Sequence, residues 1–166
     1  MIKINQKILT LSKRFFLALT ASVFATLSIG VLSFLNFELN YDLLFLIPSL
    51  GATVVLLFGF PESPFSQPKN VFFGHLITSI VGVLALNYLS LPIFLIIPIT
   101  VAIGIFFMIF LNVTHPPAGS NPIIVIVSGA SYDFILSPII SGTIILIAFA
   151  IIINRFILKK KYPINS

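Results

Sequence analysis

One polar stretch interrupts an otherwise apolar sequence: Thr114-His115-Pro116-Pro117-Ala118-Gly119-Ser120-Asn121-Pro122. No Asp, Glu, Lys or Arg occurs between Asn70 and Tyr132, so the stretch lies deep within an uncharged region. A proline lacks an N–H and clashes with the preceding turn, so a regular helix does not continue through this stretch. The polar break is therefore the first candidate for a functional site.

The composition predicts an integral membrane protein. Of 166 residues, 58% are hydrophobic and 8% are charged, whereas a soluble domain has about 25% charged residues. The mean hydropathy is +1.18, and several apolar runs have the length of roughly 20 residues that spans a bilayer. The chain has no cysteine, which excludes disulfides, thiolate metal sites and cysteine nucleophiles.

The basic residues are concentrated at the two ends of the chain, which has a net charge of +5. They flank the first and last apolar runs and are Lys3, Lys7, Lys13, Arg14, Arg155, Lys159, Lys160 and Lys161. Cytoplasmic flanks of membrane proteins carry this excess of Lys and Arg. The pattern predicts a protein of the plasma (inner) membrane with both termini in the cytoplasm, and it argues against nucleic-acid binding.

The apolar runs predict an all-α helical bundle that forms one membrane domain, residues 15–158, between basic cytoplasmic tails at 1–14 and 159–166. Four runs are long enough to span a bilayer: Phe15–Leu35, Val71–Leu89, Ile93–Leu111 and Pro138–Phe156. Two segments are broken by Pro and Gly, Leu43–Phe60 and the central stretch with Ile123–Val127. If both broken segments cross, there are six crossings; if both are re-entrant, there are four. Six crossings place Lys69 with the other basic residues in the cytoplasm, so we favour six.

A shift of 68 residues suggests an internal repeat with halves at about 15–89 and 92–158. It aligns Pro48 with Pro116, Gly51 with Gly119, Ser63 with Ser131 and Gly74 with Gly142. Each half would contain a long span, a segment broken by Pro and Gly, and another long span. Three crossings per half would make the two halves inverted repeats, an arrangement in which transporters place broken helices at the substrate site.

The two breaks predict an anion site without a buried Lys or Arg. Half-helices that begin near Ser49 and Pro117 would present unpaired N–H groups and a partial positive charge. Gly51 and Gly119 would let a ligand approach the backbone closely. The alternative is that the breaks are only kinks where helices pack. The candidate substrate-binding or pathway residues are Ser49, Gly51, Ala52, Thr53, His75, His115, Pro116, Pro117, Ala118, Gly119, Ser120 and Asn121.

The two histidines are the most informative candidates. His115 would donate a hydrogen bond to the anion or couple proton movement to transport, and a purely structural cap is an equal alternative. His75 lies on one polar face with Ser79 and Gly82, where it is either functional or satisfied by a neighbouring helix. Two histidines with few carboxylates do not make a zinc site, so we expect no metal and no cofactor.

Several motifs resemble the HPP family of integral membrane proteins. They are Gly51–Phe58, the loop Pro61–Pro64 with Gln67–Val71, the pair Gly74-His75 and, above all, His115-Pro116-Pro117-Ala118-Gly119. The resemblance covers residues 15–158. It implies transport, because plant-chloroplast and cyanobacterial members are associated with nitrite transport. It also implies four spans, the number by which the family is commonly described. Many members have Ala or Thr after the glycine, where this chain has Ser120-Asn121-Pro122.

We therefore expect a channel or secondary transporter for a small inorganic anion, nitrite first, in a lipid bilayer. The alternatives are a transporter of another small solute, an intramembrane enzyme that uses His115 and Ser120, and an accessory membrane subunit. The enzyme is disfavoured because no nearby carboxylate in the sequence would orient the histidine. A chain of 166 residues has little material to enclose a pathway alone, so a homo-oligomer is plausible.

Overall fold

The computed structural model describes residues 10–39 and 45–164, which form helices and loops with no β-strand among them. The helices are α1 (Leu11–Phe34), α2 (Pro48–Val54), α3 (Pro68–Tyr88), α4 (Ile93–Phe110), α5 (Asn121–Ser128) and α6 (Ser141–Ile151). Wider π-helical turns follow α1, α2 and α6 and precede α6, at Leu35–Leu39, Val55–Gly59, Ile152–Ile157 and Ile135–Ile140. This confirms the expected all-α architecture.

Four helical runs are long and apolar enough to cross a membrane. They are Leu11–Glu38, Pro68–Tyr88, Ile93–Phe110 and Ile135–Ile157, and a shorter apolar helix covers Pro48–Gly59. The first span begins at Leu11, four residues before the expected start, so Lys13 and Arg14 lie within its first turns rather than in a tail. Long basic side chains can extend from a helix end to the polar membrane surface, which allows the helix to begin before the apolar run does.

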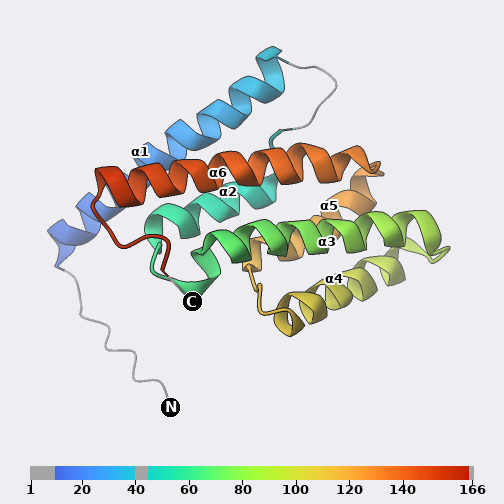
Figure 1. Ribbon diagram of the computed structural model, residues 1–166. Helices are drawn as coiled ribbons and strands as arrows, with labels where there is room; N and C mark the ends of the chain where they lie inside the picture. Colours follow the sequence, from blue (N-terminus) through green and yellow to red (C-terminus); the bar gives the residue numbers. More distant parts are fainter. Residues whose placement is uncertain (1–9, 40–44, 165–166) are drawn as a thin grey trace.

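Successive helices run in opposite directions along the bundle (Figure 1). The start of α2 lies beside the end of the first span, because Asn36 Oδ1 accepts hydrogen bonds from the N–H groups of Phe45 and Leu46. The Ser66 hydroxyl donates to the Phe60 carbonyl at 2.7 Å and ties the end of α2 to the start of α3. Consequently α1 and α3 run the same way, and the short helix α2 returns the chain between them.

The second half has the same order of long, short and long helices. Here α4 and α6 run the same way, and α5 returns the chain between them (Figure 1). The helices of this half run opposite to their counterparts in the first half, as the expected inverted repeat requires. The duplication itself stays a prediction.

Helix α3 lies at the centre of the bundle and packs closely through its small residues. A Cβ atom added at Gly82 would lie 3.0 Å from Pro122 Cα and 3.2 Å from Val125 Cβ, both on α5. On α4, a Cβ added at Gly104 would lie 3.2 Å from Thr78 Cγ2 of α3. Small residues therefore let the three backbones approach one another, as is usual for helices in a membrane, where apolar burial alone does not drive association.

The C-terminal segment folds back onto the loop between α2 and α3. Tyr162 is buried, and its hydroxyl donates to the Ser66 carbonyl at 2.8 Å. Burial raises the pKa of this phenol above its ordinary value, so it stays a neutral donor. Gln67 Oε1 accepts from the Ile164 N–H at 2.8 Å. The C-terminal segment up to Ile164 and the 61–67 loop therefore lie at the same end of the bundle.

Cysteine labelling tests the six-segment topology. The loop between α2 and α3 and the loop after α5 lie at opposite ends of the bundle (Figure 1). Glu62 is exposed in the first loop and Ser131 in the second, and the chain has no native cysteine. If α2 and α5 complete two further crossings, Glu62→Cys and Ser131→Cys will react with a membrane-impermeant maleimide from opposite sides of sealed vesicles. Labelling of both from the same side would show that the broken segments are re-entrant.

Candidate functional site

Thr53 lies in α2, one turn after Ser49. Ile47, the residue before the helix, is extended, and Pro48 is the first helical residue. At this position the fixed φ of proline is favourable, and its missing N–H costs nothing. The Thr53 hydroxyl lies 2.9 Å from the Ser49 carbonyl, an ordinary contact for threonine in a helix. The side chain is fully buried, however, and it points toward two residues from other parts of the chain.

The two histidines of the chain meet at this hydroxyl. Thr53 Oγ1 is 2.9 Å from His75 Nε2 and 2.9 Å from His115 Nε2. Both imidazoles are fully buried, and their ring centroids are 5.0 Å apart. One hydroxyl thus joins α2, α3 and the polar break, three segments that are distant in sequence.

The break holds His115 against α3 through backbone geometry. His115 itself is extended, with φ −137° and ψ 99°. A Cβ added at Gly74 would lie 2.8 Å from His115 Cβ and 3.1 Å from the Val113 carbonyl, so only glycine allows this approach. Asn70 Nδ2 donates to the Thr114 carbonyl at 3.0 Å and anchors the break from the start of α3.

Asn121, the first residue of α5, completes the centre from the other side. Its Nδ2 lies 3.0 Å from His75 Nδ1, 3.0 Å from Ser79 Oγ and 3.2 Å from Thr78 Oγ1. Among the described residues, Asn121 Oδ1 and Ser49 Oγ are buried and have no hydrogen-bond partner. The Asn121 amide oxygen can therefore accept a further hydrogen bond, and the Ser49 hydroxyl can donate one.

The contacts determine which nitrogen of each neutral histidine carries the proton. The Phe65 carbonyl lies 2.7 Å from His115 Nδ1 and can only accept, so this nitrogen carries the proton. In the neutral imidazole Nε2 then accepts from the Thr53 hydroxyl. The Thr53 oxygen accepts in turn from His75 Nε2–H, and His75 Nδ1 accepts from Asn121 Nδ2. The result is one directed chain from Asn121 through His75, Thr53 and His115 to Phe65.

The structure brings together four of the residues expected at the site: Thr53, His75, His115 and Asn121. The other expected residues lie around this centre rather than in it. Ala52 and Pro116 are exposed, Ala118 is buried, and the Ser120 hydroxyl donates to the Pro117 carbonyl within its own turn. A Cβ added at Gly51 or Gly119 would meet no atom within 4 Å, so open space lies beside both glycines.

Three important contributors were not identified from the sequence. Phe65 acts through its backbone carbonyl, which leaves no signal in the side chain. Asn154 donates to the Leu57 carbonyl at 3.0 Å, in the π-helical turn after α2. Tyr162 secures the C-terminal segment, as described above. An amide such as Asn154 in an apolar helix is costly in a membrane, and this was the one available signal.

Within residues 10–39 and 45–164, no three His, Asp or Glu side chains come together as a possible metal site.

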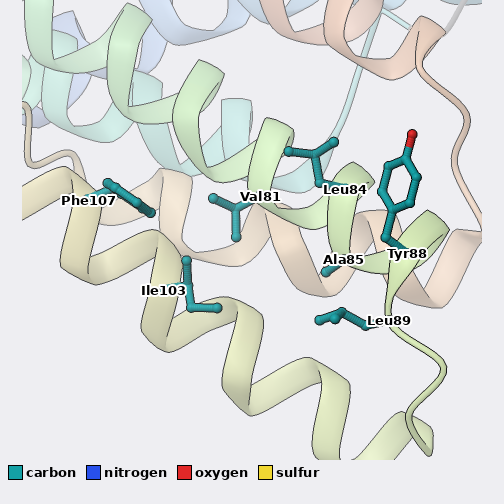
Figure 2. A pocket seen from close by; sticks show the side chains of 7 residues that line it. All are labelled: Val81, Leu84, Ala85, Tyr88, Leu89, Ile103 and Phe107. Carbon is teal, nitrogen blue, oxygen red and sulfur yellow. The ribbon is translucent and has the colours of Figure 1, made fainter.

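A cavity of about 340 Å³ lies between α3 and α4 and is lined by Val81, Leu84, Ala85, Tyr88, Leu89, Ile103 and Phe107 (Figure 2). Its lining is almost wholly apolar, so it suits a hydrocarbon chain and is separate from the polar centre.

These features define a helical membrane protein with a buried, uncharged polar centre at a His-Pro-Pro break. The model of the HPP transmembrane region matches residues 11–163. The chain belongs to the HPP family.

Two similar proteins come from Dictyostelium discoideum, and both are named only as transmembrane proteins. One is 34% identical over 126 residues, which cover 72% of this chain and 44% of the relative. The other is 32% identical over 147 residues, which cover 83% of this chain and 47% of the relative. The chain thus spans about half the length of these relatives. No solved structure matches.

Nitrogen-15 NMR of histidine-labelled protein in lipid tests the proton assignment. The contacts predict one histidine protonated at Nε2 and the other at Nδ1, and His75→Gln and His115→Gln identify which signal belongs to which ring. Neutral imidazoles of the two kinds have distinct pairs of nitrogen shifts. Two histidines with the same protonated nitrogen, or two charged rings at neutral pH, would contradict the directed chain.

Proposed function

We propose that this protein moves a small inorganic anion across the membrane, as a channel or secondary transporter. The observation that carries the proposal is the buried polar centre where both broken segments meet, since polar groups at membrane depth are costly and are kept for function. Backbone that is not helical is tolerated at such depth where protein or a water-filled cavity satisfies it. The family membership supports a membrane transport role.

The start of α2 supports an anion as the substrate. The Ser49 hydroxyl is buried there without a partner among the described residues, and a hydroxyl can donate to an anion. A cavity of about 350 Å³ adjoins this turn and is lined by Leu46, Ile47, Pro48 and Gly51. The Leu50 N–H at this position donates to the Ile47 carbonyl, so the groups that favour negative charge here are the Ser49 hydroxyl and the positive end of the helix dipole.

The absence of charge at the centre favours passage over tight binding. On the helices that surround the centre, Lys69 lies near the start of α3 and Arg155 near the end of the last helical run, and both side chains are exposed. An anion would therefore be held by neutral donors, which offset its desolvation without trapping it. Nitrite is the first candidate because of the family resemblance, and the sequence Ser120-Asn121-Pro122, which departs from the family pattern, leaves room for another small anion.

The proposal places the chain in the plasma (inner) membrane with both termini in the cytoplasm, in agreement with the basic flanks. In this orientation the 61–67 loop and the C-terminal segment are cytoplasmic. A second copy of the chain would pack against α1 or α4, whose outward-facing apolar side chains, among them Phe16, Phe94 and Phe110, otherwise face lipid.

Flux into proteoliposomes tests this function. With purified protein, nitrite should enter faster than into protein-free vesicles, and nitrate, chloride and formate in parallel measure the selectivity. Thr53→Val should lower the flux roughly ten-fold, because it leaves buried partners unpaired at a cost of about 1–3 kcal/mol.

Thr26→Val is the matched control. The Thr26 hydroxyl, like that of Thr53, lies 2.9 Å from the carbonyl four residues earlier. Thr26 is exposed on α1, so its replacement should leave the flux unchanged. Flux of every anion at the protein-free level, with correctly folded protein, would refute the proposal.

A further inference from the structure

The Thr53 hydroxyl has three hydrogen-bonding partners around it but only one hydrogen to donate. Its oxygen lies 2.9 Å from each of three atoms, the Ser49 carbonyl oxygen, His75 Nε2 and His115 Nε2. The hydroxyl has one hydrogen and two acceptor lone pairs. When both imidazoles are neutral, the hydrogen goes to His115 Nε2, and the Ser49 carbonyl receives nothing from it.

The same three distances fit a second arrangement that contains one more proton. If a proton binds His115 Nε2, the Thr53 hydrogen can turn to the Ser49 carbonyl. The Thr53 oxygen then accepts one hydrogen bond from each imidazole through its two lone pairs. His115 Nδ1–H remains on the Phe65 carbonyl. An N–H bond forms, no other covalent bond changes, and every donor has an acceptor without movement of a heavy atom.

We propose that the His75–Thr53–His115 centre takes up one proton on His115 Nε2 together with the transported anion, with the Thr53 hydroxyl as the switch. This inference rests on the anion transport proposed above, and it names the proton as the ion that is transported together with the anion. Proton and anion then cross together, and the flux of a monovalent anion carries no net charge.

The geometry limits the uptake to a single proton. His75 Nδ1 faces Asn121 Nδ2, a donor, so a second proton at that nitrogen would meet another N–H group. Two imidazolium rings with centroids 5.0 Å apart would also repel each other strongly in a buried site. The expected ratio is therefore one proton per anion.

The surroundings explain why the proton would not bind alone. The elements packed around the centre are α2, α3, α4, α5, the last helical run, the 61–67 loop and the turn Pro116–Ser120. The other described titratable groups of the helices are Lys69, Tyr88 and Arg155, all exposed and near helix ends, and the loop carries Glu62.

The described carboxylates Glu38, Glu62 and Asp133 are exposed as well. No protein anion among the described residues thus pairs with a charged His115, and an unpaired buried charge is costly. The transported anion supplies the missing counter-charge, and Ser49 Oγ, one turn from Thr53, is a spare donor for it.

Simultaneous measurement of nitrite entry and internal pH in proteoliposomes tests the coupling. Valinomycin and potassium set the membrane potential, and protein-free vesicles correct for passive entry of nitrous acid. The wild-type protein should move one proton per nitrite, and its rate should not change with the potential. Thr53→Ser retains the hydroxyl switch and should keep the ratio near one.

Thr53→Val removes the switch, so proton entry per nitrite should fall at least five-fold, whereas Thr26→Val should behave as the wild type. Nitrite flux that depends on the potential and carries no proton would overturn the coupling and leave the transport function intact. Failure of Thr53→Ser to retain coupling would also overturn it. No flux of any anion through folded protein would refute transport itself, and the coupling with it.

Discussion

The hydroxyl group of Thr53 is the constraint on which the rest of the structure depends. It joins α2, α3 and the polar break within 2.9 Å contacts. In a membrane, a broken helix leaves polar backbone that water does not satisfy, so the protein must supply the partners. Here Asn70 donates to the Thr114 carbonyl, and the Ser120 hydroxyl donates to the Pro117 carbonyl. The contacts of the Thr53 hydroxyl with the two buried imidazoles add a polar junction between the break, α2 and α3 inside an apolar bundle.

Close backbone approach makes this junction possible. Gly74 leaves the space that the Cβ of His115 occupies, and Gly82 does the same for Pro122 and Val125. The far end of α2 is secured separately. Ser66 donates to the Phe60 carbonyl, Asn154 donates to the Leu57 carbonyl, and Tyr162 donates to Ser66. The short helix is therefore held at one end by the C-terminal segment and in its interior by the two histidines.

The sequence predicted the class of fold and the residues that form the polar centre, but it did not predict how these residues contact one another. Apolar runs of sufficient length indicated the long helices, and the density of Pro and Gly indicated the breaks. Thr53, His75, His115 and Asn121 were all identified as candidates, because polar groups within apolar membrane segments are costly and are kept for a structural or functional role. Their pairing was not predicted, since it depends on how three distant segments pack.

Other features lay beyond the reach of pattern analysis for identifiable reasons. Gly51 and Gly119 were chosen because they lie at the breaks, but the glycines in tight contact are Gly74, Gly82, Gly104 and Gly142. A small residue does not reveal which backbone will approach it. The role of Phe65 lies in its main-chain oxygen, which any residue would provide. The helix start at Leu11 shows that basic residues flanking a span do not mark its end.

A double-mutant cycle between Thr53 and His115 tests the central claim most directly, with thermal unfolding measured in detergent or lipid. Thr53→Val and His115→Phe each leave a buried polar partner unpaired, so each should destabilise the protein on its own. The double variant should be more stable than the sum of the two losses by about 0.5–3 kcal/mol. The pair Thr26→Val and His115→Phe should be additive. Additive losses for Thr53 and His115 as well would contradict the account, because they would show that this hydroxyl does not hold the break together.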